Sequence, residues 1–399
     1  MIRSTYLLLL SLALTSCGVF RPSTSTLIQR AELVNAPIND TIHAQNRLGL
    51  YVVYVKVNDH EEPLEMIFDT GANLTVLTLE AAKRLELESM GGMRLGDSQG
   101  QRQSIPFVML DRLQLGQGVY EDILAAVIDF PENSTITCMA KDGILGYHVI
   151  RQLQWAVHPG DTLLVGSTSD LGSGRAYHTV PMEGWKAPLL DVEFKGMIYK
   201  NVLFDSGSTG GLDLEMDRIS YIADSIPLVR MIDGTSQGVY GNNLDTVLEA
   251  NNTNIALSGF SLPSDVEYSN NSDRKIGMKT LGRHHIIIDG PAQRLHIGQE
   301  EIPHRRSRSL SIIPNLQDTT LYVANLHIGG DADQMGIPLH QRLVSVNGVT
   351  GTQMAERECG YLEFILNLRN TDDPLVIELP SGEVVVFEKE ELEAQLIDY

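Results

Sequence analysis

The chain has 399 residues, of which 43% are hydrophobic and 6% aromatic, and its formal net charge is −21 at pH 7. This length allows two or three domains, each with its own hydrophobic core. The strong negative charge argues against a nucleic-acid-binding protein, because phosphate contacts depend on Lys and Arg side chains.

Residues 1–17 have the features of a targeting segment. Arg3 supplies a positive charge, an apolar stretch follows from Leu7 to Leu14, and Ser16 directly precedes Cys17. This ending resembles the cleavage site of bacterial lipoproteins, so we expect a lipoprotein signal peptide that leaves a lipidated Cys17 as the membrane anchor. The residues after Cys17 lack an acidic cluster, which favours the periplasmic side of the outer membrane within the cell envelope. The alternative is an ordinary signal peptide in which Cys17 is incidental.

The next segment leads into the first acidic turn. Residues 18–45 mix Ser, Thr, Pro and Asn with little periodicity, which predicts a tether. Residues 50–57 then alternate as in a half-buried strand. A second apolar run ends in Asp69-Thr70-Gly71-Ala72. Since Gly71 permits a sharp turn, we expect Asp69 to lie at the end of a buried strand.

A polar, glycine-rich stretch follows between two strand-like segments. It runs from Gly96 to Gln101 and has Ser98, Gln99 and Gly100 at its centre. Its composition predicts the tip of a hairpin.

The acidic turn occurs a second time, where Val202-Leu203-Phe204 leads into Asp205-Ser206-Gly207-Ser208. Each acidic turn is followed by a segment that ends in Leu-Gly, at Gly146 in the first half and at Gly282 in the second. The distance from Asp to Gly is 77 residues in both halves (146 − 69 and 282 − 205), so we expect the halves to align at a constant offset.

With this alignment, the segment after the Leu-Gly pair is shorter in the second half than in the first. From Gly146 to Gly166 there are 20 residues (166 − 146), but from Gly282 to Gly298 only 16 (298 − 282). We therefore expect the helical turn that follows Gly146 to be lost after Gly282.

The paired motifs resemble the two-lobed, single-chain aspartic proteases of the pepsin and retropepsin type, over about residues 46–300. The resemblance implies a mainly β fold with two homologous β-barrel-like lobes, at residues 46–168 and 185–300. It implies that Asp69 and Asp205 form the catalytic pair. It also implies that a later apolar-apolar-Gly segment packs beside each acidic turn.

The resemblance assigns further roles around the acidic turns. The hydroxyls of Thr70 and Ser206 would each reach the backbone of the opposite turn, while Gly71 and Gly207 allow the turns themselves. A hairpin tip that folds over the bound peptide, called a flap, would include Ser98, Gln99 and Gly100, with a weaker second candidate at residues 235–238. A solvated hairpin tip is the alternative interpretation of these segments.

Two carboxylates a few ångström apart cannot both ionise at low cost, so the pair would share one proton. The ionised oxygen can take a proton from water while the protonated partner hydrogen-bonds the scissile carbonyl. Ser208 follows the second turn where the first has Ala72, and a hydroxyl there can stabilise the neighbouring carboxylate. As a hypothesis, Asp69 is therefore the harder acid to ionise, with a mildly acidic to neutral pH optimum. The sequence itself leaves open which acid holds the proton.

Other chemistry has less support. His284, His285 and His296 suggest a metal site, but adjacent residues of a strand point to opposite faces, and we expect no metal and no other cofactor. Cys138 and Cys359 lie 221 residues apart (359 − 138). A disulfide between them is compatible with an oxidising compartment, but we expect both cysteines to be buried as small apolar groups.

After residue 308 the pattern changes. A strand at residues 321–326, a short helix at 331–337 and a strand entering the Asn347-Gly348 turn follow one another. This order resembles a bacterial PDZ domain over about residues 308–390, which implies a small β/α domain. Such a domain allows a peptide ligand by strand addition, although the usual Gly-apolar-Gly-apolar run before the binding strand is missing.

The sequence therefore predicts a membrane-tethered aspartic endopeptidase that hydrolyses polypeptides with Asp69, Asp205 and a water molecule. The alternative is a non-catalytic lipoprotein that binds peptides or partner proteins through the same cleft and the PDZ-like domain. A scaffold that acts through the PDZ-like domain alone has less support.

Overall fold

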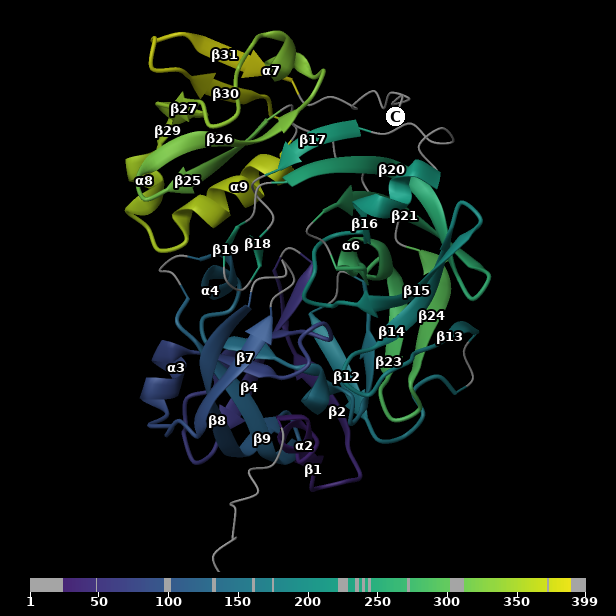
Figure 1. Cartoon of the computed structure of the whole chain (residues 1–399). Helices are drawn as coiled ribbons and strands as arrows, with labels where there is room; N and C mark the ends of the chain where they lie inside the picture. Colours follow the sequence, from purple (N-terminus) through teal and green to yellow (C-terminus); the bar gives the residue numbers. More distant parts are fainter. Residues whose placement is uncertain are drawn as a thin grey trace, which may run out of the picture.

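The computed structural model describes residues 24–47, 49–96, 102–130, 134–159, 162–173, 176–221, 229–233, 237–238, 241–242, 245–270, 273–301, 312–371 and 373–388. These residues form a mainly β structure with five sheets, which confirms the predicted fold class at this level (Figure 1). The predicted signal segment with Cys17 and the flap candidates Ser98, Gln99 and Gly100 lie outside the described residues. Within the described ranges, no helix has the length and apolar character needed to cross a membrane.

A nine-stranded sheet forms the first lobe, in the order β1-β9-β6-β10-β5-β4-β8-β7, with β3 beside β4. Its strands are β1 (Glu32–Leu33), β3 (Gln45–Arg47), β4 (Leu50–Val57), β5 (Leu64–Phe68), β6 (Thr75–Thr78), β7 (Gly91–Gly96), β8 (Arg102–Leu115), β9 (Gly118–Ile128) and β10 (Gly143–Leu145). The helices α3 (Leu79–Arg84), α4 (Thr135–Met139) and α5 (Tyr147–Ile150) accompany it. In β4, Val53, Val55 and Val57 are buried, whereas Tyr54 and Lys56 are exposed. This alternation agrees with the period of two that the sequence predicts for a strand.

A ten-stranded sheet begins in the second lobe and continues into the C-terminal part of the chain. Its second-lobe strands are β14 (Leu189–Phe194), β15 (Met197–Phe204), β16 (Leu212–Glu215), β17 (Val229–Asp233), β20 (Asp245–Leu257), β21 (Phe260–Ser269) and β22 (Lys275–Ile276). The short helices η1 (Met216–Tyr221) and α6 (Met278–Leu281) belong to this lobe. A separate two-stranded ribbon consists of β18 (Gln237–Gly238) and β19 (Gly241–Asn242).

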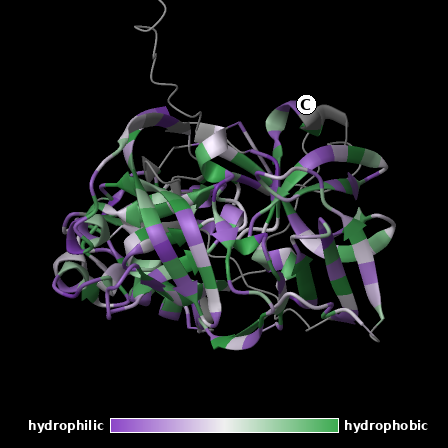
Figure 2. Ribbon diagram, turned by 90° about the horizontal axis from the view of Figure 1, so that it is seen from below, coloured by the Kyte–Doolittle hydropathy of each residue, from purple (hydrophilic) through white to green (hydrophobic). Residues whose placement is uncertain are grey.

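A six-stranded sheet joins the two lobes, in the order β13-β24-β23-β11-β12-β2. Its strands are β2 (Asn39–His43), β11 (Gln154–Val157), β12 (Leu163–Ser167), β13 (Tyr177–Pro181), β23 (His284–Asp289) and β24 (Arg294–Glu301). The β11–β12 hairpin pairs with β23 of the second lobe, and Trp155 lies opposite Ile288. The lobes therefore share one sheet. Hydrophilic and hydrophobic residues alternate along several of the strands (Figure 2).

The tether predicted for residues 18–45 needs correction for the part that the structure describes. Residues 24–45 contain helix α2 (Thr24–Ile28) and strands β1 and β2, and β2 pairs with β12 along its whole length. Ile38 and Ile42 are buried in the shared core. A few apolar side chains thus anchor a segment whose polar composition had suggested an unstructured chain.

The C-terminal unit, residues 312–388, has a hydrophobic core of its own. Its elements are β25 (Ile312–Gln317), β26 (Thr320–His327), α7 (Asp331–Gln334), β27 (Arg342–Leu343), β28 (Ser345–Val346), β29 (Val349–Thr350), α8 (Gly351–Ala355), α9 (Gly360–Asn370), β30 (Leu375–Glu378) and β31 (Val384–Phe387). Asn347 and Gly348 both have positive φ, which suits the tight turn expected between β28 and β29. The strands and helix expected from the sequence are present in this order.

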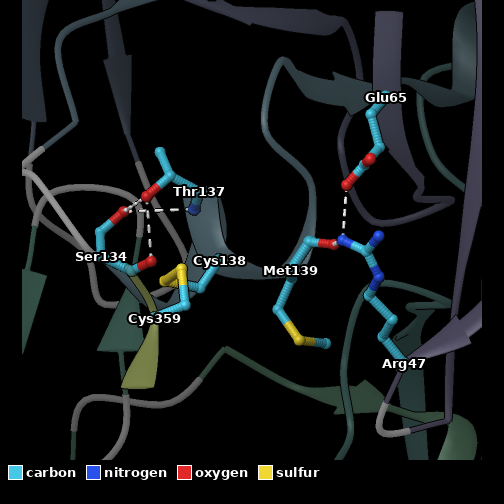
Figure 3. Close-up of a disulfide and its surroundings, with 7 residues drawn as sticks. All are labelled: Arg47, Glu65, Ser134, Thr137, Cys138, Met139 and Cys359. Carbon is cyan, nitrogen blue, oxygen red and sulfur yellow. Dashed lines mark hydrogen bonds and ion pairs between the residues drawn. A yellow bond between two sulfur atoms is a disulfide. The ribbon is translucent and has the colours of Figure 1, made fainter. Parts of the chain in front are cut away.

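Two connections fix the C-terminal unit to both lobes. Strand β26 pairs with β17 of the second lobe, so that Ile232 lies opposite Leu326. A disulfide joins Cys138 of α4 to Cys359 at the start of α9, with 5.5 Å between their Cα atoms (Figure 3). The prediction that both cysteines stay unpaired is therefore wrong. Their separation along the chain concealed that α9 packs against the first lobe, where Leu362 contacts the apolar cluster that includes Met139.

Candidate active site

The two acidic turns follow equivalent strands. Asp69 comes directly after β5, and its N–H donates to the Leu145 carbonyl oxygen of the parallel strand β10 at 3.1 Å. Asp205 comes directly after β15, and its N–H donates to the Ile276 carbonyl oxygen of the parallel strand β22 at 3.0 Å. Each acid therefore sits at the end of a buried strand, as its apolar approach predicts.

The two turns face each other closely. A Cβ atom built on Gly71 would lie 2.6 Å from Cγ of Asp205, and one built on Gly207 would lie 2.4 Å from Cγ of Asp69. Each turn thus passes so close to the carboxylate of the other lobe that only a glycine, which has no Cβ atom, fits there. This reciprocal contact brings the carboxyl groups of Asp69 and Asp205 together.

Two buried hydroxyls lock the turns to one another. The Thr70 hydroxyl donates to the Phe204 carbonyl oxygen at 2.7 Å and accepts from the Ser206 N–H at 2.9 Å. The Ser206 hydroxyl donates to the Phe68 carbonyl oxygen at 2.8 Å and accepts from the Thr70 N–H at 2.9 Å. These four hydrogen bonds run between the lobes and hold the acids at a fixed separation.

Backbone N–H groups orient the carboxylates. Oδ1 of Asp69 accepts from Gly71 N at 2.7 Å and from Ala72 N at 3.1 Å, and Oδ1 of Asp205 accepts from Gly207 N at 2.9 Å. Burial raises the pKa of Asp69 well above its ordinary value, and the facing charge and hydrogen bond of Asp205 raise it further.

The raised pKa of Asp69 agrees with the hypothesis that Asp69 is more difficult to ionise than Asp205. The physical cause, however, differs from the one expected. The Ser208 hydroxyl accepts from Gly210 N at 3.2 Å, and within the described residues no hydrogen bond joins it to Asp205. Burial and the opposing carboxylate, rather than the Ser208 hydroxyl, account for the raised pKa of Asp69.

The glycine that packs beside the second acidic turn is Gly277, which corrects the predicted alignment. In the first lobe, a Cβ on Gly146 would lie 2.4 Å from the Leu74 carbonyl carbon; in the second, a Cβ on Gly277 would lie 2.6 Å from the Gly210 carbonyl oxygen. The Asp-to-Gly distance is thus 77 residues in the first lobe (146 − 69) but 72 in the second (277 − 205).

Helix α6 follows Gly277 as α5 follows Gly146, so the prediction that this helical turn is lost is wrong. Tyr147 N donates to the Ala72 carbonyl oxygen at 2.7 Å, and Met278 N donates to the Ser208 carbonyl oxygen at 2.9 Å. Gly282 is the C-cap of α6. The Leu-Gly pair chosen as a landmark was therefore the end of this helix, and its matching distance was a coincidence.

The corrected alignment reveals two charged residues that the sequence analysis missed. Asp213 of β16 and Lys275 of β22 lie opposite each other, at the positions that Val76 and Ile144 occupy in the first lobe. Their side chains form a largely buried ion pair at 3.5 Å. Aligning the halves on Ile276-Gly277 would have shown this difference between the lobes.

The flap prediction is only partly covered by the structure. Strands β7 and β8 form the hairpin whose tip would hold Ser98, Gln99 and Gly100, and these three residues lie outside the described part. In the second lobe, Gln237 and Gly238 form β18, whereas Thr235 and Ser236 lie outside it.

The three histidines considered as a metal site lie in the shared six-stranded sheet. His285 is hydrogen-bonded through Nδ1 to the Tyr177 hydroxyl at 2.6 Å, and His296 through Nδ1 to the Thr179 hydroxyl at 2.9 Å. Among the described residues, no three or more His, Cys, Asp or Glu side chains form a group that could hold a metal ion.

A comparison with protein families agrees with the geometry of the first lobe. Residues 53–149 match the model of a family described as aspartyl protease. This range includes the Asp69 turn and Gly146 but ends before Asp205. The match supports an aspartic protease domain in this part of the chain, and hence a protease at the level of the family. A search of the curated proteins found no match to the chain.

Proposed function

We propose that the protein is an aspartic endopeptidase in which Asp69 and Asp205 together activate a water molecule. The observation that carries this proposal is the reciprocal packing of the two turns, in which Gly71 lies against the Asp205 carboxylate and Gly207 against that of Asp69. The family match at residues 53–149 supports the protease assignment for the first turn. The equivalent hydrogen bonds of the second turn extend it to Asp205.

The chemistry follows from a pair of acids that holds one proton. Asp69, whose pKa is raised, keeps the proton and donates a hydrogen bond to the carbonyl oxygen of the scissile peptide bond. Asp205 takes a proton from the water as the water oxygen attacks the carbonyl carbon. The tetrahedral intermediate then expels the amine, which receives from Asp205 the proton that this acid took from the water, and a carboxylic acid and an amine are the products. No covalent bond forms between the protein and the peptide.

The substrate in this proposal is a polypeptide, because the family is one of proteases. An extended peptide would present alternate side chains to opposite sides of the site. The C-terminal unit would act as a PDZ-like domain that helps to recruit or position the polypeptide. Its separate core and its order of strands and helices support that assignment.

The proposal also includes the location of the enzyme. Lipidation at Cys17 would tether the protein to a membrane of the bacterial cell envelope, on the periplasmic side of the outer membrane. The support is the apolar run from Leu7 to Leu14 followed by Ser16-Cys17.

The test is peptide cleavage by the protein lacking residues 1–17. A mixed peptide library would be incubated at pH 3 to 8 with this protein and with its Asp69→Asn and Asp205→Asn variants. Asp191→Asn is the matched control, because its side chain is half exposed, lies beside the surface residue Lys200 and accepts a hydrogen bond from the Asn201 N–H, which an Asn side-chain oxygen can also accept.

Cleavage should occur in the parent protein and in Asp191→Asn, and it should be lost in both active-site variants. Cleavage that survives in Asp69→Asn and Asp205→Asn would refute the proposed mechanism. Folded protein that retains peptides without cleaving them at any pH would favour the non-catalytic binding protein instead.

A further inference from the structure

The second lobe places a charged pair beside its acidic turn, whereas the first lobe has apolar residues there. Strand β16 pairs with β22, and strand β6 pairs with β10, in the same antiparallel arrangement. At the same position in this pairing, the second lobe has Asp213 opposite Lys275, and the first has Val76 opposite Ile144. The two lobes therefore differ chemically in the strand that pairs directly with the strand carrying each acid, β22 in the second lobe and β10 in the first.

The charged pair is buried. The side chains of Lys275 and Asp213 are 15% and 11% exposed, and Nζ lies 3.5 Å from Oδ2. A buried charge is costly unless it has a partner, so each residue requires the other. Replacing both by apolar residues would cost little stability, as the first lobe illustrates. This suggests that the pair is present for a reason other than folding.

The pair also lies against the turn that carries Asp205. A Cβ atom on Gly210 would lie 3.3 Å from both Oδ1 of Asp213 and Oγ of Ser208, so Asp213 contacts the residues that continue the acidic turn. Burial lowers the pKa of Lys275, but the charges of Asp213 and Asp205 outweigh it and raise that pKa above its ordinary value. The ammonium group of Lys275 therefore interacts with the Asp205 carboxylate as well as with its direct partner.

Other charges reach this site from the neighbouring elements. Asp69 faces Asp205 from the end of β5. Lys279 of α6 interacts with Asp213 but is paired with Asp265 of β21 at 2.7 Å. Glu267 of β21 acts on Lys275 less strongly than Asp205 does, and Glu249 of β20 acts on Lys279. Lys275 is thus a cation that is paired with Asp213 and also interacts with Asp205 and, less strongly, with Glu267.

We propose that Lys275, held in place by Asp213, is a positioning residue that keeps Asp205 the ionised member of the acid pair and leaves the shared proton on Asp69. This inference rests on the proposed function. A nearby cation favours the charged form of a carboxylate. The first lobe has no such cation at the equivalent position, where Ile144 lies. The two acids would therefore have fixed roles, with Asp205 as the base toward water and Asp69 as the hydrogen-bond donor to the carbonyl oxygen.

The main test is the double variant Asp213→Val/Lys275→Ile, which copies the apolar pair of the first lobe and should fold. If the cation acts mainly at Asp205, its loss destabilises the singly and the doubly ionised pair alike, so the first apparent pKa of the pair rises and the second changes less. The acidic limb of the pH–rate profile for peptide cleavage should then shift to higher pH. Lys275→Met alone should shift it further, by about one pH unit or more, since Asp213 then remains as an unopposed negative charge. Asp213→Asn alone should shift it to lower pH.

A control variant, Lys275→Arg, keeps the charge and should leave the profile in place. If the pair were purely structural, all variants would cleave more slowly, and Lys275→Met and Asp213→Asn would not move the acidic limb in opposite directions. An acidic limb that is unchanged or shifted to lower pH in the folded double variant would overturn the proposal.

Carboxyl ¹³C NMR titration of the same proteins makes the test independent of cleavage. The lower of the two apparent pKa values of the Asp69–Asp205 pair should rise in the double variant relative to the parent. If no protein in the set cleaves peptide, the proposed function fails, but this titration still decides whether Lys275 controls the ionisation of the acids. If cleavage occurs and the titration does not move, only the role of Lys275 is rejected.

Discussion

Cys138 and Cys359 join the first lobe to the C-terminal unit across 221 residues of sequence. Because β26 also extends the sheet of the second lobe, the C-terminal unit is connected to both halves of the candidate active site. Hydrogen bonds strengthen the first-lobe end of this link, where Ser134 caps α4 and the Arg47 side chain donates to the Met139 carbonyl oxygen (Figure 3). The unit is thus joined to both lobes by its own contacts and is part of the fold.

The disulfide should therefore contribute to the stability of the whole protein. In the protein lacking residues 1–17, the Cys138→Ser/Cys359→Ser variant should lose about 2–4 kcal/mol of unfolding free energy, because the cross-link closes a long loop in the unfolded chain. Urea unfolding followed by fluorescence measures this loss. A reducing agent should destabilise the parent protein and leave the variant unchanged; equal stability of the oxidised parent and the variant would contradict the prediction.

The glycines of the acidic turns should tolerate no side chain. In Gly71→Ala and Gly207→Ala the new methyl group would overlap the opposing carboxylate, at 2.6 Å and 2.4 Å from its Cγ atom. The displaced acids should lower the cleavage rate by at least about 100-fold, the usual effect of a misplacement near 1 Å. Gly172→Ala is the control, since its Cβ would lie 3.3 Å from the end of the Asp170 side chain and at ordinary contact distances, 3.9 Å and 4.0 Å, from Ile287 and Tyr177. Comparable activity in all three variants would show that the turns do not need this close contact.

The hydroxyls of Thr70 and Ser206 should matter for stability as well as for activity. Thr70→Val keeps the shape of the side chain but leaves the Phe204 carbonyl oxygen and the Ser206 N–H without their partner. Each buried group left unsatisfied costs about 1–3 kcal/mol, so the unfolding free energy should fall by at least that amount. Thr70→Ser retains the hydroxyl and serves as the control. A Thr70→Val variant as stable as Thr70→Ser would mean that these hydrogen bonds do not join the lobes.

Features encoded by a few adjacent residues could be predicted from the sequence. The acidic turns are an example, because an apolar strand, an Asp and a Gly two residues later determine the local backbone of Asp69 and Asp205. The Asn347-Gly348 turn is another, since both residues adopt positive φ at low cost.

Features that depend on distant partners could not be predicted in the same way. The position of Gly277 is defined by its packing against Gly210, and a chance Leu-Gly five residues later (282 − 277) imitated the expected spacing. Strand β2 forms because β12 offers an edge to residues 39–43, whose composition alone suggests a tether. The partner of Cys138 depends on how the C-terminal unit docks, and that docking has no short sequence signal.

The raised pKa of Asp69 predicts a specific dependence of stability on pH. Between the ordinary carboxyl pKa of about 3.8 and the higher pKa in the folded protein, the folded state binds more protons than the unfolded state, so stability falls as pH rises through this range. Asp69→Asn removes this loss and should make the protein more stable than the parent at pH 7, with a difference that shrinks toward zero as pH falls to 3.8. Urea unfolding at several pH values measures the difference, with Asp191→Asn, at a half-exposed surface carboxylate, as the control variant. A stability difference for Asp69→Asn that is independent of pH would mean that burial and Asp205 do not hold a proton on this acid.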